Sequence, residues 1–129
     1  MSLCNPFDLE KNPSIKWQGQ ILPGIDTVFC QFNSMYAGLR AGYIDIKNSI
    51  KEGYNTIQKF VTHYAPPNEN DTQSYIVSVA MHMNMKPDDV LTMNNLKELG
   101  KAVLIQEQGI CQFADSIINE AVLAAIQQA

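Results

Sequence analysis

Apolar residues recur at helical spacing along the chain from Ser34 onward. The first stripe returns to one face of a helix at intervals of four, three and four residues, and it consists of Leu39, Tyr43, Ile46 and Ile50. Ser34 is a suitable N-cap for this helix, and Gly53 a suitable end. The pattern therefore predicts a long helix between these two residues.

The same reasoning predicts five more helical stretches. They cover residues 57–64, a segment from a cap at Asn70 or Asp71 to Met83, residues 88–91, a segment from Asn94 or Asn95 to Gly109, and residues 111–127. In the last helix the predicted apolar side consists of Phe113, Ile117, Val122 and Ile126. The six methionines are predicted to fill the core, including Met81, Met83 and Met85.

The first third of the chain has a different pattern. Turn signals at Pro23-Gly24 separate two runs, residues 15–21 and 25–32, and the second run alternates in character. This predicts a small β-hairpin within residues 4–32, followed by a helical region over residues 34–128. The expected fold class is α+β, mainly α, in one domain covering residues 1–129.

Composition narrows the function only by exclusion. The 129 residues are 46% hydrophobic and 17% charged, which is too apolar for intrinsic disorder. Nine Lys+Arg against thirteen Asp+Glu give a net charge of −4, which argues against nucleic-acid and anionic-membrane partners. No membrane-spanning run and no secretory leader are recognised, so we expect synthesis in the cytoplasm and no membrane partner.

Metal and cofactor sites are not expected either. The three cysteines, Cys4, Cys30 and Cys111, form no CxxC pair. The two histidines, His63 and His82, are 19 residues apart and lack an HExxH pattern, so each is expected to be a surface or core residue.

Glu107 is the main catalytic candidate. It continues the apolar stripe of Leu96, Leu99 and Val103 at the C-terminal end of a predicted helix. Partial burial and the negative end of the helix would both raise the pKa of its carboxyl, as a general acid in glycoside cleavage requires. The alternative is that the helix frays there and Glu107 lies in water.

Two segments resemble a known family. Residues 4–19 read C-N-P-F-D-L-E-K-N-P-S-I-K-W-Q-G and residues 29–41 read F-C-Q-F-N-S-M-Y-A-G-L-R-A. Together they resemble lysozyme-like peptidoglycan hydrolases, particularly flagellar-type glucosaminidases. Residues 4–91 also resemble small phage and prophage virion proteins, most specifically in residues 64–75, which read Y-A-P-P-N-E-N-D-T-Q-S-Y.

The resemblance implies a changed chain order. In lysozyme-like enzymes the catalytic Glu ends a helix before the N-x-F turn, but here only four residues precede that turn. Residues 99–109, L-G-K-A-V-L-I-Q-E-Q-G, resemble the missing helix. A circular permutation would explain this order, and it predicts that Glu107 lies near Asn5 and Phe7.

The function that the resemblance implies is a phage-type peptidoglycan glycosidase or lytic transglycosylase with Glu107 as general acid. It needs no cofactor. The candidate sugar-binding residues are Trp17, Tyr64, Asn70, Thr72 and Tyr75. The alternative for Trp17 is a packing anchor, and for the residue 64–75 motif it is turn and capping chemistry. A second carboxylate could be Asp8, Glu10 or Asp26, each equally readable as a solvated turn residue.

An inactive phage virion protein with a lysozyme-like shape is the competing hypothesis, and the acidic balance favours it. A host-side regulator of such an enzyme is a third. The expected partners are accordingly peptidoglycan glycan strands or phage virion proteins, with the chain virion-associated or delivered to the cell wall.

Overall fold

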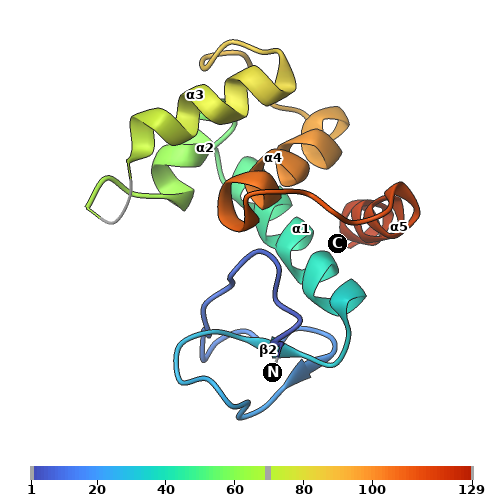
Figure 1. The fold of residues 1–129 in the computed structure, drawn as a ribbon. Helices are drawn as coiled ribbons and strands as arrows, with labels where there is room; N and C mark the ends of the chain where they lie inside the picture. The colour runs from blue at the N-terminus through green and yellow to red at the C-terminus, as the bar shows by residue number, and fades with distance from the viewer. Residues whose placement is uncertain (1, 69–70, 129) are drawn as a thin grey trace. The chain divides into compact units, whose positions relative to one another are not determined.

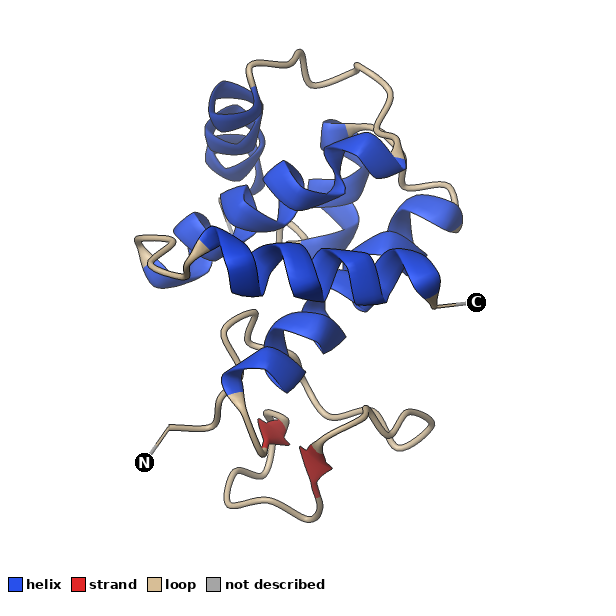
Figure 2. Cartoon of the chain, turned by 90° about the vertical axis from the view of Figure 1, so that its right-hand side faces the viewer, coloured by secondary structure: helices blue, strands red, loops and turns tan. Residues whose placement is uncertain are grey.

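The computed structural model describes residues 2–68 and 71–128. Across these residues it contains five α-helices, one short 3-10 helix and one two-stranded sheet (Figures 1 and 2). The mainly helical α+β class predicted from the sequence is therefore confirmed. The chain divides into two compact units, Met1–Ile44 with Gln112–Ala129, and Asp45–Cys111. The prediction of one domain over residues 1–129 stays a prediction.

The sheet of the first unit is shorter than the sequence suggests. Its strands β1 (Gln20–Ile21) and β2 (Gln31–Phe32) pair antiparallel, with Gln20 opposite Phe32. The predicted second strand pairs with the first only at its end, because residues 28–30 pair with residues 9–11 instead, through an antiparallel bridge between Glu10 and Phe29. The Lys11 ammonium donates to the carbonyls of Pro23 and Asp26. The Asp26 carboxylate accepts from the backbone N–H groups that follow it.

Helix α1 (Met35–Lys51) begins as predicted, with the Ser34 hydroxyl accepting from the Ala37 N–H at 3.1 Å. Its predicted stripe of Leu39, Tyr43, Ile46 and Ile50 is buried. Within the first unit, α1 lies against the N-terminal segment at two glycines. A Cβ on Gly38 would lie 2.0 Å from the Cys4 carbonyl oxygen, and one on Gly42 would lie 2.0 Å from the Phe7 ring. The G-L-R-A-G sequence thus permits close packing of the N-P-F turn.

The second unit contains α2 (Ile57–Tyr64), α3 (Thr72–Met83), the 3-10 helix η1 (Met93–Asn95) and α4 (Leu96–Gln108). Helix α3 contacts both α2 and α4. Asp71 caps α3 by accepting from the Ser74 N–H, and α4 ends at Gly109 with a φ of 82°. The predicted helix over residues 88–91 is wrong: Asp89 closes a turn back to Lys86 there.

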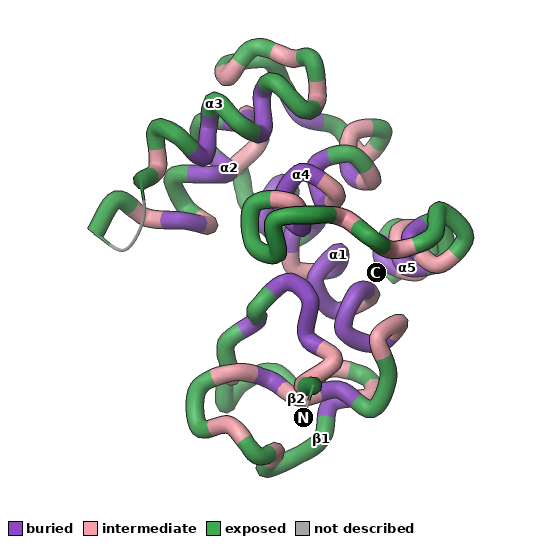
Figure 3. Tube along the Cα trace, in the orientation of Figure 1, coloured by how far each residue is buried: buried purple, intermediate pink, exposed green. Residues whose placement is uncertain are grey.

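Helix α5 (Asp115–Gln127) belongs to the first unit and begins four residues later than predicted. Its buried side consists of Ile118, Ala121 and Ala125, whereas Ile126 is 46% exposed. The predicted apolar side was therefore wrong, because each of these buried positions lies one residue away from a predicted one, namely Ile117, Val122 or Ile126. Met81 is also no core residue, since 77% of it is exposed, while Met83 and Met85 are half-buried. Figure 3 shows both buried and exposed stretches along α3.

Candidate functional site

The structure brings together two of the candidate site residues, Tyr75 and Glu107. The Tyr75 hydroxyl donates to Oε1 of Glu107 at 3.4 Å, across 32 residues of sequence. Tyr75 lies in the first turns of α3 and is 3% exposed, so its ring is packed and only its hydroxyl reaches the carboxylate. The most specific motif of the chain and its candidate acid therefore meet at one place.

Tyr75 acts at this contact as a neutral phenol. Burial, together with the charge of Glu107 and the hydrogen bond to it, raises the pKa of Tyr75 far above its ordinary value. The hydroxyl consequently keeps its proton throughout the physiological pH range. It can donate to an ionised carboxylate or accept from a protonated one.

The expected partial burial of Glu107 is wrong. Leu96, Leu99 and Val103 on the same stripe are fully buried, but α4 continues beyond its packed part and residues 106–110 are all exposed. The cause is that the stripe extends one turn past the neighbouring packing. Exposure removes the desolvation expected to keep Glu107 protonated, and leaves its carboxylate accessible to a large substrate.

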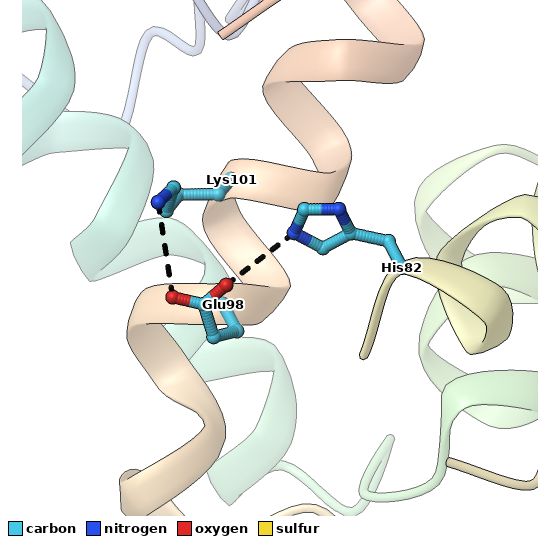
Figure 4. Close-up of polar contacts among 3 residues, drawn as sticks. All are labelled: His82, Glu98 and Lys101. Carbon is cyan, nitrogen blue, oxygen red and sulfur yellow. Dashed lines mark ion pairs between the residues drawn. The ribbon is translucent and has the colours of Figure 1, made fainter. Parts of the chain in front are cut away.

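A second polar contact ties the same two helices together. His82 of α3 lies 3.4 Å from Glu98 of α4 through its Nε2 atom, and Lys101 lies 3.9 Å from the other oxygen of Glu98 (Figure 4). Tyr75 precedes His82, whereas its partner Glu107 follows Glu98, so α3 and α4 pack antiparallel. The two contacts fix both ends of the pair, and thereby the position of Glu107 relative to Tyr75.

Tyr64 and Thr72 have structural contacts on either side of the loop between α2 and α3. The Tyr64 ring stacks on Phe60 with centroids 5.1 Å apart, and the Thr72 hydroxyl donates to the carbonyl of Ala65 at 2.7 Å. Both residues are half-buried. Asn70 lies outside the described residues. The sugar-binding roles of these three residues stay predictions, while turn and capping chemistry accounts for the contacts that Thr72 makes.

Trp17 and the candidate second carboxylates lie in the first unit. Trp17 is half-buried and precedes β1 rather than lying on a strand, contrary to expectation, and its backbone N–H donates to Oε1 of Gln20. Backbone N–H groups of Phe29 and Val28 lower the pKa of Asp26, whereas burial raises the pKa of Asp8. Glu10 is exposed.

Asn5 and Phe7, the expected neighbours of Glu107, have clear roles within the first unit. The Asn5 side chain donates to the carbonyls of Leu9 and Cys30 and accepts from the Leu9 N–H. Phe7 packs edge-on against Tyr43 with ring centroids 5.4 Å apart. These contacts explain the N-P-F sequence as a folded turn, and the proximity of Glu107 stays a prediction.

The second unit also contains a cluster of polar and aromatic side chains that the sequence did not predict. The rings of Tyr54 and His63 stack with centroids 3.8 Å apart and 6° between their planes, and the charge of His63 acts on the half-buried Asp45. A signal was available, because His63 follows Lys59 by four residues on a predicted helix and therefore shares its face.

The part of the chain that the structure describes contains neither a cluster of metal-binding side chains nor a helix able to span a membrane. Residues 2–68 and 71–128 include no group of three or more His, Cys, Asp or Glu placed to hold a metal ion. Within those same ranges, every helix is too short or too polar to cross a membrane. Cys4, Cys30 and Cys111 are free thiols.

Comparison with known proteins supports a phage connection. Protein P5 of Pseudoalteromonas phage PM2 is 26% identical to the chain over 108 residues, covering 81% of the chain and 68% of P5. No family model matches. The chain is therefore similar to a phage protein, and its resemblance to lysozyme-like hydrolases rests on the sequence motifs alone.

Proposed function

We propose that the chain is a phage-type peptidoglycan glycosidase or lytic transglycosylase in which Glu107 is the general acid. The observation that carries the proposal is the contact between the Tyr75 hydroxyl and the Glu107 carboxylate. It joins two segments that the sequence motifs had singled out separately. Similarity to a phage protein supports the phage origin that this proposal assumes.

In the proposed reaction Glu107 gives up one proton and later regains one. Glu107 donates its proton to the glycosidic oxygen as the bond to the anomeric carbon breaks. Water, or the 6-hydroxyl of the same sugar, then adds to that carbon and returns a proton to Glu107. The Tyr75 hydroxyl is a suitable partner in both states, because it accepts from the acid and donates to the carboxylate. Tyr75 is thus a positioning residue.

Because Glu107 is exposed, burial does not contribute to the proton affinity of its carboxyl. Without burial, the remaining influence is the C-terminal end of α4, where the helix dipole carries partial negative charge. This charge favours the protonated carboxyl. A glycan strand that covers the site would add desolvation only when it binds.

A phage virion protein without catalysis is the second candidate. The net charge of −4 favours it, because an acidic protein is repelled by an anionic wall. The exposed position of Glu107 also suits a carboxylate that does nothing but accept a hydrogen bond. Under this proposal the partners are other virion proteins.

The test compares Glu107→Gln with Glu120→Gln, which removes an exposed carboxylate from α5. Purified peptidoglycan of several wall types is incubated with each protein, and clearing is followed by turbidity with circular dichroism as the folding control. The enzyme proposal expects clearing by wild type and Glu120→Gln, and a loss of about 10²–10⁴ in rate for Glu107→Gln. Mass spectrometry of the fragments distinguishes hydrated ends from anhydro ends.

Two results would reject the enzyme proposal. Equal clearing by wild type and Glu107→Gln would exclude a catalytic role for Glu107. No clearing by wild type on any wall type would favour the virion protein.

A further inference from the structure

Helix α3 of the second unit carries an exposed apolar ridge formed by Val77 and Met81. These residues lie one turn apart and are 46% and 77% exposed, although the helix packs against both α2 and α4. Tyr75 precedes Val77 by two residues, which places it on the opposite, buried side of α3 with its contact to Glu107. The apolar ridge is therefore separate from the candidate site.

Each flank of the apolar ridge is hollowed. A hollow of about 540 Å³, the serine groove, lies between the ridge and the exposed residues Ser74 and Ser78. A second hollow of about 550 Å³ lies on the flank of Ala80. Ser74 and Ser78 are four residues apart, as Val77 and Met81 are, so the groove runs parallel to the ridge. Two helices pack by placing such ridges of one into such grooves of the other.

A ridge beside a groove is complementary to a second copy of the same surface. A two-fold axis perpendicular to α3 turns the second copy antiparallel and places the ridge of each copy in the groove of the other. Val77 and Met81 are equally far in sequence from Val79. An axis at that level along the helix therefore seats Met81 level with Val77 of the second copy, between its Ser74 and Ser78.

The charges at the two ends of α3 favour the same register. Asp71 caps the start of the helix, Lys86 follows its end, and both are exposed. They are equally far in sequence from a point between Ser78 and Val79, so the same axis brings Asp71 of one copy to the end that carries Lys86 of the other. Asp89 lies beside Lys86, and its Oδ2 accepts from the Lys86 backbone N–H. The pairing of charges consequently contributes more to register than to affinity.

We propose that α3 binds a second copy of the chain, antiparallel, with Met81 of each copy seated in the serine groove of the other. The 12 residues of α3 span about 18 Å. One helix pair of this length covers less than the ~800 Å² per partner of a stable complex, so the dimer is reversible and forms only as protein concentration rises. The inference goes beyond the proposed function, because the apolar ridge and Tyr75 lie on opposite sides of α3.

Sedimentation equilibrium of the full-length protein measures the association. The average mass is expected to rise from one chain toward two between micromolar and millimolar concentration. Met81→Lys places a charge on the apolar ridge and should raise the Kd at least about tenfold. The matched variant Leu123→Lys changes an exposed apolar residue of α5 and should leave the Kd unchanged. Circular dichroism checks that each variant is folded.

Ser78 tests the seat of the Met81 side chain. Ser78→Leu fills the serine groove and should weaken the dimer as strongly as Met81→Lys does, whereas Ser78→Ala keeps the groove open and should preserve the dimer. A mass of one chain at all concentrations would overturn the inference. So would a dimer that survives both Met81→Lys and Ser78→Leu, or one that Leu123→Lys dissociates.

A charge cycle tests the antiparallel register. Lys86→Glu should raise the Kd about threefold, because it faces Asp71 of the second copy, whereas Lys59→Glu, an equal change of charge on α2, should not. Asp71→Asn keeps a side-chain oxygen that caps α3. It should weaken the wild-type dimer and strengthen the dimer of Lys86→Glu. The same effect of Asp71→Asn in both backgrounds would overturn the antiparallel arrangement, and with it the inference.

Discussion

Gly38→Ala tests the packing of the N-terminal segment on α1 in the first unit. The new Cβ would lie 2.0 Å from the carbonyl oxygen of Cys4 and 2.9 Å from Cδ of Pro6. Ordinary contact begins at 3.4 Å, so the Cys4 carbonyl must move by 3.4 − 2.0 = 1.4 Å. This carbonyl has little freedom to move, because Cys4 has a φ of 54° and the side-chain hydrogen bonds of Asn5 hold the next residue in place.

Two opposing contributions decide whether Gly38→Ala raises or lowers the free energy of unfolding. Alanine in an unobstructed helix is about 1 kcal/mol more stable than glycine. Overpacking that forces a backbone shift costs up to about 3 kcal/mol. The expected result is a loss of about 2 kcal/mol in the free energy of unfolding, measured by urea denaturation with circular dichroism.

Gly42→Ala provides the matched comparison, because its Cβ would meet the Phe7 side chain rather than backbone. Phe7→Leu should partly rescue Gly42→Ala and leave Gly38→Ala unrescued, which a double-mutant cycle resolves. A gain of about 1 kcal/mol for Gly38→Ala, the value for an open helix, would refute the close packing of Cys4 on α1.

Two further predictions concern the second unit. Tyr75→Phe should lower the free energy of unfolding by less than about 1 kcal/mol, because the lost hydrogen bond is long and its acceptor is exposed. The same substitution should slow wall clearing, measured by turbidity, by about tenfold. An unchanged rate would exclude a positioning role for Tyr75. Burial raises the pKa of Asp45 above 3.8, so the folded chain binds more protons than the unfolded chain and stability falls as pH rises from 3.8 through the raised value. Asp45→Asn should remove this decline in urea titrations at several pH values, and an identical pH dependence in variant and wild type would contradict the prediction.

Helical periodicity predicted most of the fold because it reports local backbone geometry. The stripe from Leu39 to Ile50 and the ends of α1 and α4 at Gly53 and Gly109 follow from spacing and from glycine conformations. The hairpin was overestimated because residues 28–30 pair with the N-terminal residues 9–11 and not with the first predicted strand. The Lys11 ammonium also donates hydrogen bonds to the carbonyl groups of Pro23 and Asp26, a contact that an alternating sequence pattern does not reveal.

The site was less predictable because it depends on tertiary contacts. The stripe through Leu96, Leu99 and Val103 correctly identified a buried side of α4, but periodicity carries no information on where the neighbouring packing ends, and Glu107 lies beyond that end. The pairing of Tyr75 with Glu107 depends on the antiparallel arrangement of α3 and α4. The Tyr54 and His63 stack requires the Gly53 turn to bring the chain back beside α2.

Glu107 has a structural role, as the hydrogen-bond acceptor of Tyr75, and a proposed chemical role, as a proton donor. The two roles depend on different atoms of the side chain. A phenol hydroxyl on a buried ring loses about 1–3 kcal/mol if it is left without a partner, and Glu107 provides the hydroxyl of Tyr75 with an acceptor. A Gln side chain carries a carbonyl oxygen and meets that requirement as well as Glu does. A glycosidic oxygen requires a proton from a carboxyl, which Gln does not supply. Glu107→Gln therefore keeps the structural role intact and removes only the chemistry, so a change in wall clearing without a change in stability can be assigned to catalysis.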